Sequence, residues 1–322
     1  MSMTLTVVIP THGRPSLLAR TLASVAACAR PSGYGGCVVV ENGPPAGAAA
    51  VVAEAAATHP EAGFRYLHHA RANKSAALTA ALAALAASGS TSGPASDPEA
   101  GVSEAAHLAV FLDDDVRVSP GVLLAYAEAA AAHPKAAYFG GPVACDYEER
   151  PPEWLRSLLP MSARGLGEAD AERQGYFLGF NWAAWAGEVA SAGGFDPAYG
   201  PGSPTGARGQ ESDMQRRLRA AGARQVFVAD AEVHHFVPVE RCTPAWAVQR
   251  AYHSAERLGH IARHAGGRRD LRATLLGVAW HPLQAAVGTV RADERLRTEA
   301  LASLAYDIGY LKGFFLSGPP TS

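Results

Sequence analysis

The sequence predicts an α/β fold in which a mostly parallel sheet is flanked by helices and followed by a helical C-terminal extension. Short apolar runs rich in Val, Ile, Leu and Phe alternate with alanine-rich helical segments through the first half of the chain. These runs are apolar along their whole length, which is typical of parallel strands buried on both faces. With 322 residues, of which 48% are hydrophobic, the chain can bury the core of one large domain and an appended segment.

The individual elements follow from this alternation and from the positions of Pro and Gly. Strands are expected at 5–9, 37–41, 64–69, 108–112 and 225–229, and helices at 15–29, 48–59, 74–87 and 211–222. Residues 88–106 are rich in Ser, Gly, Pro and Ala, and we expect a flexible surface insert there. Residues 142–209 are rich in Pro, Gly and Trp and are expected to be irregular, as is common around binding sites. Residues 243–322 are expected to form about three helices.

The composition argues against several classes of protein. A formal net charge of −2 and a pI near 6.6 do not suit a nucleic-acid-binding domain, which usually has a basic excess. The first residues lack the basic and apolar regions of a signal peptide, and no run of about 18 apolar residues suggests a membrane span. The four cysteines have no CxxC spacing, which favours reduced thiols over a zinc site or a disulfide framework. We therefore expect a cytoplasmic protein that binds no nucleic acid.

Three consecutive aspartates, Asp113, Asp114 and Asp115, follow the strand expected at 108–112. Adjacent like charges repel, and removing them from water is costly unless they are paired or bind a metal. Ligands of open α/β sheets bind at the carboxyl ends of the strands. Carboxylates at such an end suit a hard divalent cation, and the cation in turn suits a diphosphate. The alternative, a cap for the helix that begins near Pro120, requires only one acid.

Five stretches occur in the order found in family 2 glycosyltransferases, which the chain resembles over about residues 4–240. They are VVIPTHGRP, VVVENG, FLDDDV, GQESDMQRRLRAAG and AEVHHFVP. The resemblance implies a GT-A fold, which is Rossmann-like, in a catalytic domain spanning 1–242, with 243–322 as the extension. It also implies an inverting, Mn²⁺- or Mg²⁺-dependent transfer of a sugar from a nucleotide-diphosphate sugar, first of all a UDP-sugar, to an acceptor hydroxyl. The acceptor class stays open between a glycan, a lipid-linked acceptor and a small molecule.

The resemblance places the donor nucleotide among residues that follow the first four strands. These are Pro10, Thr11, Arg14, Glu41, Asn73, Lys74, Asp113 and Asp114. Glu41 stands where the family usually has an aspartate that reads the base, and the alternative is a simple turn formed with Asn42 and Gly43. Lys74 opens a helix, where phosphate oxygens are well placed, and the alternative is a solvated surface lysine.

The metal ligands implied by the resemblance are Asp115, supported by Asp113, and a histidine at the end of a later strand. His234 matches the family's strand-end histidine, with its neighbour His235 as the alternative. An imidazole beside carboxylates suits Mn²⁺ better than Mg²⁺. A purely structural role is the alternative for either histidine.

The catalytic base must be a carboxylate that accepts the proton of the acceptor hydroxyl. Aligned on Arg217 and Leu218, Glu211 stands where the family has its base, and Asp213 is the alternative. Both lie near the start of a helix, whose positive dipole end favours an ionised carboxylate. Acids in a first helical turn are also common without any catalytic role, which is the alternative for both.

The stretch LGFNWAAW resembles the family's segment that meets the donor sugar and the acceptor. Asn181, Trp182 and Trp185 are therefore expected at the sugar and acceptor site. Tryptophans can stack on a sugar ring, but they are equally suited to a core. The glycines of 193–202 suggest a loop that can order over a bound donor.

Two other functions fit parts of the sequence. A nucleotidyltransferase shares the use of a nucleotide and a cation, but it usually has a glycine- and basic-rich loop where this chain has IPTHGRP. A non-catalytic sugar-nucleotide-binding protein of the same fold would not need the acids at 113–115 and 211. The segment 243–322 is expected to pack on the catalytic domain, and a homodimer interface or peripheral contact with a membrane are the alternatives.

Overall fold

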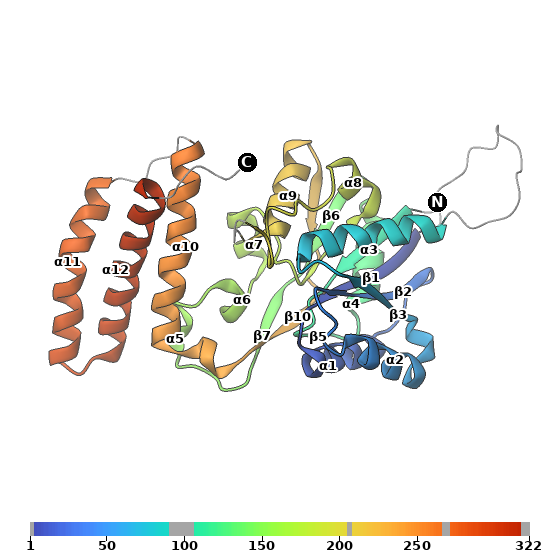
Figure 1. Ribbon diagram of the computed structural model, residues 1–322, viewed down its shortest axis with the longest axis horizontal. Helices are drawn as coiled ribbons and strands as arrows, with labels where there is room; N and C mark the ends of the chain where they lie inside the picture. Colours follow the sequence, from blue (N-terminus) through green and yellow to red (C-terminus); the bar gives the residue numbers. More distant parts are fainter. Residues whose placement is uncertain (1–2, 90–105, 205–207, 266–270, 317–322) are drawn as a thin grey trace, which may run out of the picture. The chain divides into compact units, whose positions relative to one another are not determined.

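The computed structural model describes residues 3–89, 106–204, 208–265 and 271–316. The chain divides into two compact units (Figure 1). The N-terminal unit contains Met1–Ala144 and Gly165–His235, and the C-terminal unit contains Cys145–Arg164 and Phe236–Ser322. The insert expected at 88–106 lies almost entirely outside the described residues, and the catalytic-domain boundary expected after residue 242 stays a prediction.

The N-terminal unit is built on a seven-stranded sheet of order β3–β2–β1–β4–β8–β6–β9. Its strands are β1 (Met3–Thr11), β2 (Tyr34–Asn42), β3 (Phe64–His69), β4 (Ala106–Phe111), β6 (Ala136–Gly140), β8 (Trp182–Trp185) and β9 (Arg224–Phe227). Strand β1 pairs in parallel with both β2 and β4, and β2 pairs in parallel with β3. Strands β6 and β9 are also parallel, whereas β8 runs antiparallel to both β4 and β6. The predicted α/β fold with a mostly parallel sheet is therefore confirmed.

Helices connect these strands and cover both faces of the sheet. The longer ones are α1 (Pro15–Ala26), α2 (Ala48–Thr58), α3 (Lys74–Gly89), α4 (Val122–Ala132) and α9 (Gln210–Ala220), and a 3₁₀ turn spans Pro60–Ala62. Helices α1 and α2 lie on one face and α3 on the other (Figure 1). This follows from the strand order, because the chain moves outward from β1 to β3 and then crosses back to β4 through α3.

The region expected to be irregular, 142–209, holds several short elements. They are β7 (Val143–Tyr147), α5 (Glu153–Arg156), α6 (Met161–Arg164), α7 (Glu168–Gln174), β8 and α8 (Ala186–Ser191). A second sheet has the order β5–β10–β7, with β5 at Val116–Val118 and β10 at Val233–Val237. In the antiparallel pair of β10 and β5, His235 lies opposite Val116. Because β5 directly follows the three aspartates, this pairing brings β10 beside them.

The core of the N-terminal unit supports the ends of the strands that carry the polar loops. Phe111, the last residue of β4, stacks on Trp182 of β8 with ring centroids 4.6 Å apart, and both rings meet Phe195 edge-on. At Gly140, the last residue of β6, the ring of Phe177 occupies the space that a side chain would need. The loop after β4 is therefore attached to a tightly packed aromatic support.

The described residues of the C-terminal unit form three long helices, as expected: α10 (Pro244–Ala265), α11 (Leu271–Val290) and α12 (Glu294–Phe315). A 3₁₀ turn at Val239–Cys242 precedes them. Helix α12 lies between the other two (Figure 1). It approaches α10 closely, because a Cβ atom added at Gly309 or Gly313 would collide with the α10 backbone. Among the described residues, no helix combines the length and the apolar character needed to cross a membrane.

The close packing of α10 and α12 leads to a prediction for Gly313. Gly313→Ala should lower the free energy of unfolding of the C-terminal unit by about 1–3 kcal/mol, because the new methyl group meets the Glu256 carbonyl oxygen. Gly187→Ala in α8 is the matched control, since nothing lies within 4 Å of its added Cβ, and alanine favours a helix over glycine by about 1 kcal/mol. Urea unfolding followed by circular dichroism measures both variants. Equal unfolding midpoints for the two would contradict the close packing.

Candidate functional site

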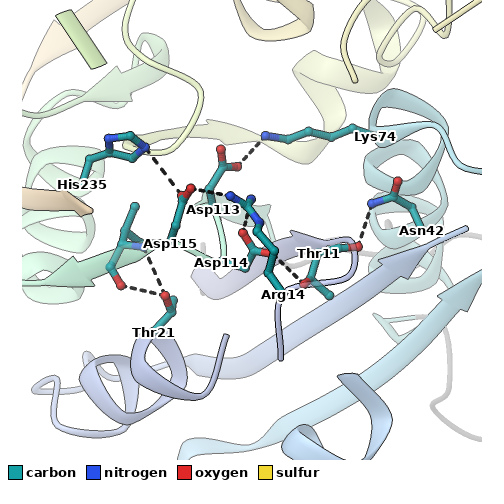
Figure 2. Close-up of polar contacts among 10 residues, drawn as sticks. Thr11, Arg14, Thr21, Asn42, Lys74, Asp113, Asp114, Asp115 and His235 are labelled. Atoms are coloured by element: carbon teal, nitrogen blue, oxygen red, sulfur yellow. Dashed lines mark hydrogen bonds and ion pairs between the residues drawn. The ribbon is translucent and has the colours of Figure 1, made fainter. Parts of the chain in front are cut away.

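The three aspartates lie in the loop after β4 and point toward different partners (Figure 2). Asp113 accepts a hydrogen bond from Nζ of Lys74, the first residue of α3, at 2.5 Å. Burial alone would lower the pKa of Lys74, but the adjacent Asp113 carboxylate raises it above its ordinary value, so the lysine is an ammonium ion. Lys74 is therefore a paired and mostly buried lysine and not a solvated surface one, and its contact with the donor stays a prediction.

Asp114 is completely buried and holds the loop after β1. Its Oδ2 accepts a hydrogen bond at 2.6 Å from the hydroxyl of Thr11, which follows the buried Pro10, and its Oδ1 forms an ion pair with Arg14. Burial raises the pKa of Asp114 to about 6, although Arg14 and Thr11 oppose the rise. Asn42 joins the group by donating from Nδ2 to the Thr11 carbonyl oxygen at 2.8 Å (Figure 2). One polar network thus ties together the ends of β1, β2 and β4.

Asp115 is nearly buried and has one carboxylate oxygen that is not hydrogen-bonded. Its Oδ2 accepts a hydrogen bond from Arg14 at 2.6 Å. Its Oδ1 has no hydrogen-bond partner in the part of the chain that the structure describes, and Nε2 of His235 lies 3.7 Å from it. A buried oxygen without a partner costs about 1–3 kcal/mol. This oxygen is therefore suited to a further ligand.

Strand β10 presents His235, not His234, to the aspartates. Successive side chains of a strand point to opposite faces, and Nε2 of His234 instead pairs with Oε1 of Glu232 at 3.0 Å. The ring of His235 stacks on Phe180, with centroids 4.4 Å apart and planes at 17°, and this contact orients the imidazole. Of the two histidines, the structure brings the alternative, His235, and not His234 beside the aspartates, and binding of a metal by either one stays a prediction.

These groups fit a hard divalent cation. An unsatisfied carboxylate oxygen beside an imidazole nitrogen is a donor pair that Mn²⁺ accepts. Among the described residues, no three His, Cys, Asp or Glu side chains gather closely enough to hold an ion by themselves. Asp115 and His235 would therefore supply two ligands, and phosphate oxygens and water would complete the shell of the cation, as is usual for Mg²⁺. A supporting role for Asp113, which pairs with Lys74, stays a prediction.

Glu41, expected to read the base, has both carboxylate oxygens engaged within the protein. Oε1 accepts hydrogen bonds from the backbone N–H groups of Ala46 and Ala48 at 2.7 and 3.4 Å, and Oε2 accepts one from the Tyr66 hydroxyl at 2.6 Å. Burial opposes ionisation, but these hydrogen bonds hold the pKa of Glu41 below its ordinary value. The residue is 1% exposed. Its side chain links the turn before α2 to β3. These contacts fit a role in the turn better than recognition of a base.

Asn73, expected at the donor, caps α3 and holds a loop. Its Oδ1 accepts a hydrogen bond from the Ala76 N–H at 2.9 Å. Its Nδ2 donates to the carbonyl oxygens of Pro197 and Gly202 at 2.9 and 3.4 Å. The side chain is buried and its polar groups are engaged within the protein. The loop 197–202, which leads toward α9, is therefore attached to the start of α3.

Two further hydrogen bonds attach this loop. The Ser75 hydroxyl donates to the Tyr199 carbonyl oxygen at 2.7 Å, and the Lys74 N–H donates to that of Pro201 at 3.0 Å. Sequence reasoning missed the attachment. An asparagine before a helix is a capping signal that could have identified part of it. The loop contacts carry no such signal, since 124 positions separate Asn73 from Pro197.

Asp213 belongs to the framework of α9. Its carboxylate accepts hydrogen bonds from Arg216 at 2.6 Å and from Arg217 at 2.9 Å. Arg217 also donates to the carbonyl oxygens of Ala192 and Gly194 at the end of α8. The buried acid therefore orients an arginine that joins two segments, and both of its oxygens are engaged.

Glu211 lies at the start of the same helix, on the side of the aspartate loop. Its side chain lies against Gly179, where an added Cβ would come within 3.0 Å of it. Its carboxylate is close enough to Lys74 to help raise the pKa of that lysine. Of the two acids expected to act as base, Glu211 is the one beside the candidate site.

Asn181, Trp182 and Trp185, expected at the sugar and acceptor site, pack into the protein instead. Asn181 is fully buried, accepts a hydrogen bond from the Tyr126 hydroxyl at 2.7 Å and donates to two backbone carbonyl oxygens at 2.8 Å. Trp182 is 1% exposed against Phe111, and Trp185 donates to a backbone carbonyl oxygen of β6 at 2.9 Å. The positions of Asn181 and Trp182 fit the core alternative, because β8 lies inside the sheet between β4 and β6, whereas Trp185 is half-buried. A role of these residues at a sugar or acceptor stays a prediction.

The anchored loop leads to a prediction for Asn73. Asn73→Ser keeps an acceptor for the helix cap but removes both amide donors to the loop 197–202. We expect the backbone amides of this loop to exchange hydrogen roughly tenfold faster or more, because each lost hydrogen bond contributes on the order of 1 kcal/mol. Hydrogen exchange with mass spectrometry measures this, with the amides of α2 as the internal control. Unchanged exchange in the loop would show that Asn73 does not hold it.

Comparison with known proteins identifies the family of the chain. The family described as "Glycosyltransferase like family 2" matches residues 3–252, which is more than half of the chain. The succinoglycan biosynthesis protein ExoM of Rhizobium meliloti (strain 1021) is 32% identical over 168 residues, which span 50% of this chain and 50% of that relative.

A similar fold occurs in the mannosyltransferase PcManGT from Pyrobaculum calidifontis, solved in complex with GDP-Man and Mn²⁺. The TM-score is 0.59 at 19% identity, and the match covers 98% of this chain and 88% of that one. At this identity the likeness concerns the fold alone, and it agrees with the expected GT-A architecture. Together with the order of the five sequence stretches, the match over residues 3–252 establishes that the chain belongs to the glycosyltransferase-like family 2.

Proposed function

We propose that this protein transfers a sugar from a nucleoside-diphosphate sugar to an acceptor hydroxyl, with inversion at the anomeric carbon and with a divalent cation. The observation that carries the proposal is the loop after β4, where the unsatisfied oxygen of Asp115 and the imidazole of His235 face each other. Lys74 and Arg14 supply cationic groups to the same loop. Membership of the family supports the reaction class, and the fold neighbour binds GDP-Man and Mn²⁺.

The donor would bind at the carboxyl ends of β1 and β4, where open α/β sheets bind ligands. The side chain of Arg14 is 39% exposed although it pairs with two aspartates, so its guanidinium can also meet a phosphate oxygen. Asp113, which pairs with Lys74, would accept hydrogen bonds from the ribose hydroxyls. We retain a UDP-sugar as the first donor to test and add GDP-sugars because of the fold neighbour. Base recognition by Glu41 would require the turn before α2 to open.

A bound cation would neutralise the charge that develops on the departing diphosphate. The residues of this chain would then perform the remaining tasks. Asp115 and His235, with support from Asp113, would hold the ion, and Lys74 faces the same loop as an ammonium ion. Phe180 keeps the imidazole in place by stacking.

Glu211 would be the general base. Its carboxylate accepts the proton of the acceptor hydroxyl while the acceptor oxygen forms a bond to the anomeric carbon and the bond from that carbon to the diphosphate breaks. The N-terminus of α9 and the nearby Lys74 both favour the ionised form that this task requires. The acceptor is proposed only as a hydroxyl compound, whether glycan, lipid-linked or small molecule.

The first test is calorimetric titration of UDP, GDP and dTDP into the protein, with Mn²⁺ and with EDTA. We expect one nucleotide to bind well only with Mn²⁺. His235→Ala should weaken this metal-dependent binding by at least about tenfold, whereas His234→Ala, which removes the contact with Glu232, should leave it unchanged. Binding of no nucleotide under either condition, or an equal loss in both variants, would refute the proposed cation site.

The second test separates the two acids of α9. Glu211→Gln should keep donor binding and lower the turnover number by about 10²–10⁴-fold, the usual contribution of a general base. Asp213→Asn should destabilise the protein by about 1–3 kcal/mol, because it disrupts the contacts with Arg216 and Arg217. Turnover is measured as hydrolysis or transfer from the donor that calorimetry identifies. Normal turnover of Glu211→Gln would exclude it as the base, and donor binding without any turnover in the native protein would favour a non-catalytic binding protein.

A further inference from the structure

Helix α11 turns its small residues inward and its large apolar residues outward. Thr274, Ala285 and Gly288 are buried, and a Cβ atom added at Gly277 or Gly288 would collide with α12. The opposite side carries a row of large side chains that are 42% to 87% exposed. This row, here called the α11 stripe, consists of Leu276, Trp280, Leu283, Val287 and Val290.

The spacing of the α11 stripe alternates between four and three residues, so its members share one side of the helix. In a bundle that is stable in water the large apolar side chains normally face the neighbouring helices. Here α11 has the reverse arrangement, with small residues at the helix contact, as in helices surrounded by lipid. An exposed apolar surface of this kind marks a site of contact with another molecule or a membrane.

The charges around the stripe decide between a lipid surface and a second copy of the chain. The sequence has no charged residue from 273 to 290, and arginines, Arg272 and Arg291, stand at both ends. Two α11 helices packed antiparallel would set Arg272 of one copy beside Arg291 of the other, and parallel packing would also join like charges. Anionic lipid headgroups would instead pair with both arginines.

The overall distribution of charge agrees with this choice. Residues 243–322 contain ten Lys and Arg against six Asp and Glu, whereas residues 1–242 contain eighteen against twenty-four. The C-terminal segment therefore has an excess of basic residues, although the net charge of the whole chain is −2. A basic segment with an apolar stripe and a central tryptophan has the properties of a helix that lies in a membrane interface.

We propose that α11 binds to the surface of an anionic lipid membrane, with the α11 stripe at the acyl boundary and Arg272 and Arg291 at the headgroups. The helix lies in the interface and does not span the bilayer, since no described helix is long and apolar enough to do so. This inference does not rest on the proposed sugar transfer. Its test requires neither donor nor acceptor, so its failure and that of the proposed function are distinguishable.

The test is co-sedimentation of the full chain with vesicles of phosphatidylcholine, alone or mixed with phosphatidylglycerol, at low and high salt. We expect binding to the mixed vesicles at low salt, weaker binding at high salt, and little to phosphatidylcholine alone. The fluorescence of Trp280, which is 58% exposed, should shift to shorter wavelength on binding. Trp280→Phe should lose that shift while it still sediments with the vesicles.

Three variants identify the surface. Trp280→Asp should weaken partitioning by on the order of tenfold or more, because it places a charge in the stripe. The double change Arg272→Gln and Arg291→Gln should weaken it by roughly thirtyfold on anionic vesicles. Leu258→Asp in α10 is the matched control, since Leu258 is an exposed leucine (41%) outside α11, and it should bind normally.

Two outcomes would overturn the proposal. One is that the protein does not bind anionic vesicles, or binds them equally well with and without Trp280→Asp. The other is that sedimentation equilibrium without lipid shows a dimer that Trp280→Asp converts to a monomer, which would assign the stripe to a second copy. Circular dichroism of each variant shows whether the fold is retained. The double change Arg272→Gln and Arg291→Gln removes two positive charges and so tests the surface without altering the apolar stripe.

Discussion

The requirement to neutralise three adjacent carboxylates at the end of β4 determines the arrangement of the N-terminal unit. Carboxylates removed from water are stable only when cations, hydrogen bonds or metal ions compensate their charge. Asp113, Asp114 and Asp115 obtain this compensation from segments that are distant in the sequence, with Lys74 and Arg14 as the cations. The aspartate loop is therefore the point at which the loop after β1, the start of α3 and strand β10 converge (Figure 2).

Within this cluster the three acids differ in how far they are buried and in which of their oxygens are hydrogen-bonded. Asp114 is fully enclosed, with both oxygens engaged by Thr11 and Arg14, so it is part of the framework. Asp115 retains one oxygen without a hydrogen bond among the described residues. The same short motif thus contains a structural acid, Asp114, and an acid, Asp115, that we propose as a ligand for the cation. This explains why three acids occur where a helix cap would need one.

The sequence predicted the elements and the location of the site better than the orientation of individual side chains. Continuous apolar runs identified β1 to β4, because strands covered on both faces show no alternation. The choice between His234 and His235 depends on the register of β10 against β5, and a shift of one residue would exchange their faces. The contacts of Trp182 and Glu41 were not predicted, because their partners, Phe111 and the backbone of the turn before α2, come together only in the folded chain.

The donor side and the base side of the proposed site share an anchor at the start of α3. Lys74 neutralises Asp113, while the preceding residue, Asn73, holds the loop 197–202 that leads toward α9. At the other end, Asp213 orients Arg217, which joins α9 to the end of α8. The position of Glu211 is therefore set from both directions by contacts that do not involve Glu211 itself. Two adjacent residues at the start of α3 therefore connect the aspartate loop to the loop 197–202, although these segments are far apart in the sequence.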